Sequence, residues 1–365
     1  MYTVWFGRQN SFSKRGSRGG EAFLSWRERR LGGCVQREQT AYRIIAVFRV
    51  PCYHEVIPKQ QKYDERGPMF MSKVYFTREI TPDSLVRMYE ALGVSLKGKV
   101  AVKMSTGESE LSNHLRPELI EKLVKKLNGT IVECCTAYGG SRQDVRSHWN
   151  EIHKRGFEKV APVDIMDEFA EFDIPIENGF HLKKDIVGEH LKNYDSVLIL
   201  SHFKGHVMGG FGGALKNISI GIGSTHGKAL IHSAGVTTDP EECWNVGTKQ
   251  DDFLESMADA CKAVINYMHA TKGPDSMLYI SVANRLSVDC DCDGHPHEPE
   301  MGDLGIFAST DPVALDQACY DAVKNAKDPG KAALVERMDS RHAIRTVEAA
   351  FEHGLGERTY ELIEI

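Results

Sequence analysis

Residues 201–217, SHFKGHVMGGFGGALKN, contain two histidines and two lysines, which are potential ligands, together with five glycines. Imidazoles can bind a metal or move a proton near neutral pH, and lysines supply positive charge or an amine. Glycine lets the backbone approach a ligand closely. This density favours a ligand site over the alternative, a turn-rich connector with ordinary surface histidines. The residues that we assign to binding in this segment are Lys204, Gly209, Gly210, Gly212, Gly213 and Lys216.

The chain continues as ISIGIGSTHGKALIH, which adds His226, Lys228 and His232. This stretch is not a phosphate-binding P-loop, because Gly223 stands too close to Gly227 and because Ala229 replaces the hydroxyl residue that binds Mg²⁺. An imidazole pair and a lysine beside a glycine-lined backbone suit a metal or an anionic cofactor instead.

A second chemical cluster is the acidic cysteine loop, DCDCDGHPHEPEMGD at residues 289–303. Thiolates of Cys290 and Cys292, with nearby imidazoles, would suit zinc, iron or nickel. The spacing matches no standard zinc finger, and the prolines and cysteines disfavour an EF-hand. A metal site and an exposed acidic loop therefore both remain open.

The chain has nine cysteines, an odd number at irregular spacing, which does not suit a disulfide framework. It contains no CxxCxxC run, so no ferredoxin-type cluster motif is present.

From residue 71 the pattern alternates between strand and helix, which predicts an α/β fold with a mostly parallel sheet flanked by helices. Beyond the strand and helix of 71–93, strands are predicted over 99–105, 130–135, 196–201, 276–284, 304–309 and 360–365, and helices over 116–129, 142–156, 251–270, 311–326 and 341–354. Ligands of such sheets bind beyond the carboxyl ends of the strands, and the glycine-rich segment leaves one such end.

Composition limits the classes of function. The chain is 41% hydrophobic and 26% charged, with a net charge of −6. It has no apolar run long enough for a membrane span and no apolar signal region. We therefore expect a cytoplasmic protein whose partners include neither nucleic acid nor membrane.

Residues 1–70 differ from the rest, with 13 basic and 6 acidic residues and no sustained periodicity. We predict that they are a non-native or unstructured extension and that Met71 is the native start. A mitochondrial-type targeting segment is the alternative, which Glu21, Glu28 and Glu38 disfavour. Residues 71–365 would form the α/β domain.

From about Ser72 to Ile365 the sequence resembles domain-of-unknown-function family 362 (DUF362), often labelled as iron–sulfur-centre proteins. The matching motifs are RP at 116–117, AYGGSR at 137–142 with His148, LSHFKGHVMGGFGGALKN at 200–217, CDC at 290–292 and GDLGIFASTDPVALDQA at 302–318. Many members carry an inserted ferredoxin module, where this chain has only Cys243 and Cys261. It resembles a member without that module, for which a separate ferredoxin is a possible partner.

A more distant resemblance is to the cofactor domain of nickel-dependent lactate racemase. It implies that Lys216 carries a nickel-pincer nucleotide, that His232 binds nickel and that His206 is an acid/base. Arg116 resembles that family's substrate- or phosphate-binding arginine. Ser141 stands where the racemase has a second acid/base histidine, and His148 is the candidate replacement.

We therefore predict a protein that binds a metal or metallocofactor and a small anionic ligand through the glycine-rich segment. It would be an enzyme of anaerobic-type metabolism acting on a hydroxy or oxo acid. The alternative is a non-catalytic iron–sulfur, metal-handling or electron-transfer protein built on Cys290 and Cys292. The predicted catalytic residues are His206, Lys216 and His148; the metal ligands are His232, His206, Cys290 and Cys292; the anion-binding arginines are Arg116 and Arg142.

Overall fold

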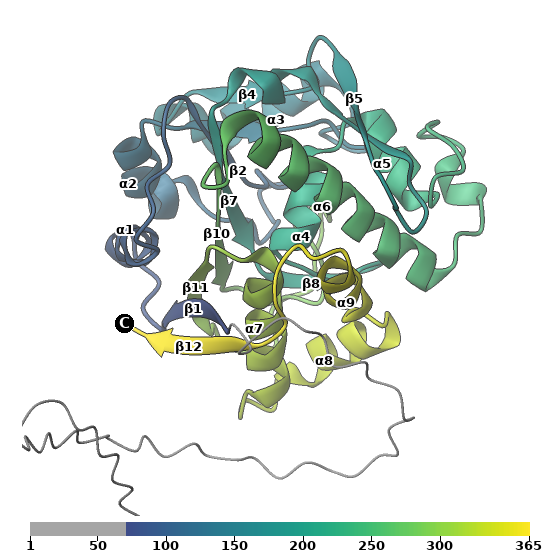
Figure 1. Cartoon of the computed structure of the whole chain (residues 1–365). Helices are drawn as coiled ribbons and strands as arrows, with labels where there is room; N and C mark the ends of the chain where they lie inside the picture. Colours follow the sequence, from purple (N-terminus) through teal and green to yellow (C-terminus); the bar gives the residue numbers. More distant parts are fainter. Residues whose placement is uncertain (1–70) are drawn as a thin grey trace, which may run out of the picture. The chain divides into compact units, whose positions relative to one another are not determined.

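The computed structural model describes residues 71–365, and the predictions made for residues 1–70 lie outside this range. Its centre is an eight-stranded sheet with the strand order β12-β1-β11-β10-β7-β2-β3-β4 (Figure 1). The strands are β1 (Ser72–Thr77), β2 (Val100–Lys103), β3 (Thr130–Glu133), β4 (Val163–Ile165), β7 (Ser196–His202), β10 (Met277–Ala283), β11 (Gly305–Ser309) and β12 (Tyr360–Glu364).

Most neighbouring strands of this sheet run parallel. The strands from β10 through β7, β2 and β3 to β4 are all parallel to one another. Strand β11 is antiparallel to both of its neighbours, β10 and β1, and β12 is parallel to β1 at the edge. The predicted α/β class with a mostly parallel sheet is confirmed.

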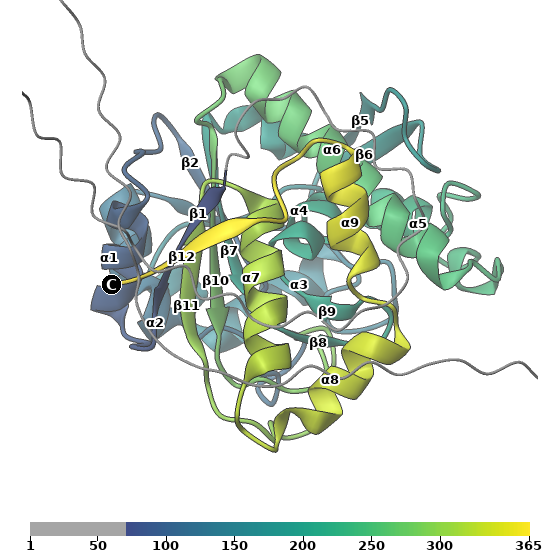
Figure 2. The ribbon, with the colours of Figure 1, turned by 60° about the horizontal axis from the view of Figure 1, so that its bottom comes forward.

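Helices cover both faces of the sheet (Figures 1 and 2). They are α1 (Pro82–Ala91), α2 (Pro117–Leu127), α3 (Val145–Arg155), α4 (Ala214–Ile222), α5 (Thr225–His232), α6 (Gln250–Lys272), α7 (Pro312–Asn325), α8 (Lys331–Ser340) and α9 (Arg345–Glu352). Leu85 of α1, Ile120 of α2 and Ile152 of α3 belong to one buried apolar cluster. Helices α4 to α9 belong to the other cluster, which includes Ile218 and Val264. Burial of each helix's apolar stripe against one face of the sheet therefore produces three layers.

Local signals explain several helix ends. Asp311 caps α7, where its carboxylate accepts hydrogen bonds from the backbone N–H groups of Val313 (2.8 Å) and Ala314 (3.0 Å). Gly156 ends α3 in the left-handed conformation, with φ of 74°. At the end of α2 the left-handed position is held by Asn128, one residue before Gly129, where the predicted helix ends.

The glycine-rich segment is more regular than the expected loop. It contains the end of β7, a small hairpin of β8 (Lys204–His206) and β9 (Gly210–Gly212), and the first turn of α4. A second small hairpin pairs β5 (Glu171–Pro175) with β6 (Lys184–Gly188). The predicted helix at 341–354 begins later, at Arg345.

The connections around β2 and β7 create a ligand crevice. From β2 the chain passes through α2 to β3, and from β7 it passes through α4 to α6 on the opposite face to β10. The chain thus leaves these adjacent strands in opposite directions, the point where open α/β sheets bind ligands. No helix within residues 71–365 is both long and apolar enough to cross a membrane.

Candidate metal and anion site

A cavity of about 510 Å³ lies beyond the carboxyl ends of β2, β3 and β7. Lys103, Glu133 and His202, the last residues of these strands, all line it. The rest of the wall includes the glycine-rich segment, α5, the acidic cysteine loop and the segment 134–142 that follows β3. The two regions that the sequence singled out separately therefore form one site.

Gly212 and Gly213 line the cavity, whereas Gly209 and Gly210 are not among its lining residues. Gly213 permits a close approach to Asp316 of α7, whose carboxylate accepts hydrogen bonds from Ala214 N (2.7 Å) and Leu215 N (2.9 Å). A Cβ atom at position 213 would lie 2.3 Å from Asp316 Oδ1. The start of α4 is thus capped by a protein carboxylate and is not open to an anionic ligand.

We predict that Gly213→Ala lowers the free energy of unfolding by about 1–3 kcal/mol, because the new methyl group must displace the Asp316 cap. Gly139→Ala is the control, since a Cβ there would meet only Gln143 Oε1, at 3.6 Å. Denaturant unfolding measures both variants. Equal stability of the two would show that the Gly213–Asp316 contact carries no packing constraint.

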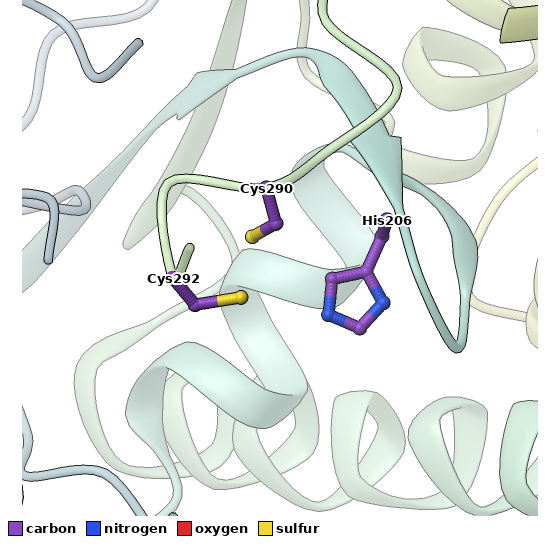
Figure 3. Close-up of side chains that lie close together, drawn as sticks. All are labelled: His206, Cys290 and Cys292. Atoms are coloured by element: carbon purple, nitrogen blue, oxygen red, sulfur yellow. The ribbon is translucent and has the colours of Figure 1, made fainter. Parts of the chain in front are cut away.

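His206 approaches the two cysteines of the acidic loop (Figure 3). One ring nitrogen of His206 and the sulfurs of Cys290 and Cys292 all lie within 4.8 Å of one another. The Nδ1 atom of His206 accepts hydrogen bonds from the backbone N–H groups of Gly209 (2.8 Å) and Met208 (3.2 Å). In the neutral ring the proton therefore sits on Nε2, the nitrogen that faces the sulfurs, so His206 is arranged as a hydrogen-bond donor.

The two thiols differ in their electrostatics. The hydrogen bond from Cys292 lowers the pKa of Cys290 well below its usual range, with help from Lys216 and Lys204. The pKa of Cys292 is raised, first because its proton is held by Cys290 and then because it is buried. Lys216 Nζ lies 3.5 Å from Cys290 Sγ. Cys290 is therefore the more acidic of the two thiols and lies beside a lysine, and two thiols of this kind suit a thiophilic metal.

His232, on α5, has the opposite tautomer to His206. Its Nδ1–H donates to the backbone carbonyl of Lys228 at 2.7 Å, which leaves Nε2 without a proton. Metal-binding histidines commonly have such a hydrogen bond from one ring nitrogen to a backbone carbonyl, which leaves the other nitrogen free for the metal. Burial lowers the pKa of His232 to about 4, so the ring is neutral near pH 7. The ring stacks on Phe253 and contacts Trp244 at the cavity wall.

Three lysines of the cavity have no carboxylate partner among the described residues. Within residues 71–365, no carboxylate lies within 4.0 Å of Lys103, Lys216 or Lys228 in an ion pair, and all three line the cavity. Lys228 Nζ donates to the backbone carbonyl of Gly223. Buried or half-buried ammonium groups without partners favour an anionic ligand.

Lys204 is different, because it is paired with Asp291 of the cysteine loop at 2.8 Å. The same carboxylate contacts His202 Nδ1 at 2.7 Å, and His202 Nε2 contacts the carbonyl of Asn284 at 2.6 Å. Burial would raise the pKa of Asp291, but His202 and Lys204 hold it well below its usual range. The Asp291 side chain therefore anchors the loop that presents Cys290 and Cys292.

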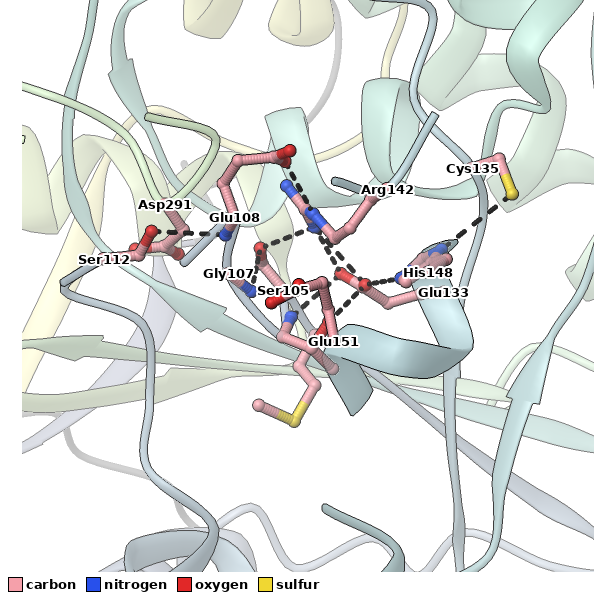
Figure 4. A network of polar contacts seen from close by, with 12 residues as sticks. Ser105, Gly107, Glu108, Ser112, Glu133, Cys135, Arg142, His148, Glu151 and Asp291 are labelled. Carbon is pink, nitrogen blue, oxygen red and sulfur yellow. Dashed lines mark hydrogen bonds and ion pairs between the residues drawn. The ribbon is translucent and has the colours of Figure 1, made fainter. Parts of the chain in front are cut away.

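A buried charge network lies beside the cavity (Figure 4). Arg142 donates to Glu108 at 3.0 Å and to Glu133 at 3.2 Å. His148 Nε2 contacts Glu133 Oε2 at 2.7 Å. Arg142 lines the cavity with both carboxylates, whereas His148 is fully buried and is not among the lining residues. The Arg142 guanidinium is thus already paired with two carboxylates. His148 contacts Glu133 from the protein interior and does not reach the cavity.

Arg116, the other predicted anion-binding arginine, is not among the residues that line the cavity. It forms the start of α2 and donates to the Ser112 carbonyl at 3.1 Å, while its guanidinium contacts the His114 ring. The structure therefore does not bring it to the candidate site.

Sequence reasoning missed Lys103, Glu133 and Glu108, and it included Asp291 only as one carboxylate of the acidic cysteine loop. A signal existed for two of them: Lys103 and Glu133 are charged residues at the ends of otherwise apolar strands, KVAVKMS and TIVECC. A charge at such a strand end is placed where an α/β sheet binds its ligands.

Comparisons with known proteins agree with the family motifs. The family model "Domain of unknown function (DUF362)" matches residues 100–321. Similar solved structures include the lactate racemase apoprotein from Thermoanaerobacterium thermosaccharolyticum, at 14% identity and a TM-score of 0.38, covering 66% of this chain and 55% of that one. Another is a protein from Thermotoga maritima, at 12% identity and a TM-score of 0.38, covering 74% of this chain and 58% of that one.

The chain thus spans less than two thirds of the length of either solved protein. No curated protein matches the sequence. The family match covers more than half of the chain and includes the glycine-rich segment and the cysteine loop, and the chain belongs to the DUF362 family.

Proposed function

We propose that the cavity binds a metal ion, or a metallocofactor, together with a small anionic ligand. The observation that carries this proposal is the pair of cysteine sulfurs, Cys290 and Cys292, which lie within 4.8 Å of each other and of a ring nitrogen of His206. They lie in a cavity that also presents three lysines without carboxylate partners among the described residues. Thiolate and imidazole ligands suit nickel, iron or zinc, and the lysines suit carboxylate or phosphate groups.

The two histidines receive different roles from their tautomers. We assign Cys290 and Cys292 to the metal, and we add His232 because its ring presents an unprotonated nitrogen. His232 lines the same cavity but lies outside the 4.8 Å group that His206 forms with the two sulfurs. We assign His206 to hydrogen bonding or proton transfer with the bound ligand, because its Nε2–H faces the cysteine sulfurs. Metal binding through His206 Nε2 would require its proton to move to Nδ1, which already accepts two backbone N–H groups.

A nickel-pincer nucleotide is one form that the metallocofactor could take. The chain's residues fit such a group, since Lys216 lines the cavity without an ion-pair partner among the described residues and His232 offers a bare nitrogen on the same cavity. A substrate that is a small hydroxy or oxo acid would be held by the remaining lysines. Such a protein would be an enzyme of anaerobic-type metabolism.

The test is metal analysis and intact mass of full-length protein purified anaerobically from its native host. We expect stoichiometric metal that is lost in Cys290→Ser, Cys292→Ser and His232→Gln, and retained in His206→Gln. Cys243→Ser is the matched control, because Cys243 is a buried thiol that is not among the cavity-lining residues. Metal-free wild-type protein, or equal metal in all variants, would contradict the proposal.

Lys216→Met separates the two readings of the site. Loss of a covalent mass increment and of the metal together would support a lysine-attached cofactor. Metal retained in Lys216→Met but lost in Cys290→Ser would instead support the alternative, a metal-handling or electron-transfer protein that uses the cysteines alone.

A further inference from the structure

Lys103 is a buried lysine that belongs neither to the glycine-rich segment nor to the acidic cysteine loop. It is the last residue of β2, at the point where the chain directions of β2 and β7 diverge, and it lines the cavity. Only 2% of the residue is exposed. Within residues 71–365 it has no ion-pair partner, although burial of an unpaired ammonium group is unfavourable.

The hydrogen bonds of Lys103 match a neutral amine. Its Nζ donates to the carbonyl oxygen of Met104 at 2.8 Å and to Asn217 Oδ1 at 3.2 Å. A neutral amine has two N–H bonds and one lone pair, so these two acceptors satisfy both donors. An ammonium group would have a third N–H without an acceptor in this arrangement. The remaining position on the nitrogen is therefore suited to a lone pair.

Asn217, on α4, holds this amine in place. Its Nδ2 donates to the Lys103 carbonyl at 3.0 Å and to Ser201 Oγ at 3.1 Å, which orients Oδ1 toward the lysine. Gly221, one turn further along α4, leaves room for the lysine, since a Cβ there would lie 2.9 Å from Lys103 Nζ. The amine is thus held by the ends of two strands and by one helix.

Burial of Lys103 acts in the same direction as this geometry, whereas the neighbouring charges act in both directions. Burial lowers the pKa of Lys103 to about 8, and Lys228 on α5 and Arg142 add to the lowering. Glu133 and Cys134, both from the end of β3, act in the opposite sense. About a tenth of such a group is uncharged at pH 7. Desolvation and a neighbouring cation are the usual means by which a protein makes a lysine nucleophilic.

We propose that Lys103 is a nucleophilic amine that forms an imine with a small oxo acid bound in the cavity, with Lys228 holding the acid's carboxylate. This inference deepens the proposed function and rests on its anionic ligand. The nitrogen lone pair attacks the carbonyl carbon, and a C–N bond forms. The two N–H protons then leave with the carbonyl oxygen as water, and a C=N bond remains. A hydroxy acid lacks the electrophilic carbonyl and does not react.

The test is reductive trapping on the full chain after chelation of any bound metal. The protein is incubated with pyruvate or glyoxylate and borohydride, and the modified peptide is located by mass spectrometry. We expect one major adduct, on the peptide that contains Lys103, heavier by the mass of pyruvic acid less one oxygen atom in the pyruvate sample. Lactate should produce no adduct.

Variants provide a second readout. Lys103→Met should abolish trapping, and Lys73→Met, which removes an exposed lysine, should leave it unchanged. Mapping in the wild-type protein remains decisive even if Lys103→Met fails to fold. Trapping confined to Lys216, Lys228 or surface lysines would overturn the inference, as would folded wild-type protein that traps neither oxo acid.

The two proposals fail separately. Trapping is measured on metal-free protein, so its outcome does not depend on the metal site. Absence of metal from the native protein would overturn the metal proposal and leave a Lys103 adduct as independent support for the oxo acid.

Discussion

Arg142→Met is expected to lower the free energy of unfolding by about 3–5 kcal/mol, the usual cost of removing one partner from a buried charge network. Arg142 and Glu133 side chains are 5% and 3% exposed, so water cannot replace the lost contacts. The variant leaves the buried carboxylates of Glu108 and Glu133 without the guanidinium that joins them (Figure 4). Methionine retains much of the side-chain volume of arginine. The decrease in the free energy of unfolding is therefore due to the missing charge and not to a large cavity.

Chemical unfolding at pH 7 measures this effect, with Lys122→Met as the matched control. Lys122 pairs with Asp83 at 2.8 Å, but these side chains are 57% and 69% exposed, so that change should cost less than about 1 kcal/mol. Similar losses in the two variants would contradict the role assigned to the network.

The same network predicts a dependence of stability on pH. Burial would raise the pKa of Glu133, but Arg142 and the hydrogen bond from His148 hold it well below its usual range. A depressed folded-state pKa stabilises the protein above the unfolded value of about 4.3, and this stabilisation is lost as pH falls toward the folded value. Arg142→Met should therefore flatten the fall in unfolding free energy on the acidic side of pH 4.3.

Asp291→Asn is expected to weaken metal binding by about 10- to 100-fold, the usual effect of removing a residue that supports a metal site's ligands. Asp291 lies between the two cysteines in the chain and is fully buried. Its carboxylate holds Lys204 and His202, and its backbone carbonyl accepts a hydrogen bond from Glu108 N at 2.8 Å. Asparagine keeps the size but removes the charge, which leaves Lys204 buried without its partner.

Metal titration of the apoprotein under anaerobic conditions measures this change. Asp293→Asn is the control, because Asp293 belongs to the same loop but its side-chain hydrogen bond is to a backbone group, His295 N, at 2.8 Å. A reduced affinity in Asp293→Asn and an unchanged affinity in Asp291→Asn would reverse the assignment. Thermal unfolding of both apoproteins separates loss of the site from loss of the fold.

The elements that sequence patterns predicted well are those that bury an apolar run. The strand predicted at 196–201 is β7, and the helix predicted at 251–270 lies within α6. Their side-chain periodicity and end signals are local, so a single stretch of chain contains the information. Strands β4 and β5 and helix α8 were not predicted, because they are short and many of their residues are exposed or partly buried. Strand β6 and helices α4 and α5 are mostly buried and were also missed, because they are short.

The candidate site was predicted in pieces. The glycine-rich segment and the cysteine loop were interpreted as bases for two competing functions. The structure places both on one cavity, with Lys216 Nζ at 3.5 Å from Cys290 Sγ. The residues stand 74 positions apart, and no local pattern reports such a distance.

By itself the sequence determined the α/β class, the family motifs and the two segments rich in ligand-type side chains, because residue types and short-range periodicity are properties of the chain. The tertiary structure alone decided which groups share the cavity. It engaged Arg142 with two carboxylates, kept Arg116 out of the cavity lining and brought Lys103 to the cavity beside Asn217. It also set the opposite tautomers of His206 and His232. Strand order decides which residues reach the cavity. Hydrogen-bond partners, which are distant in the sequence or positioned by the backbone conformation, decide the charge and the proton position of each buried group.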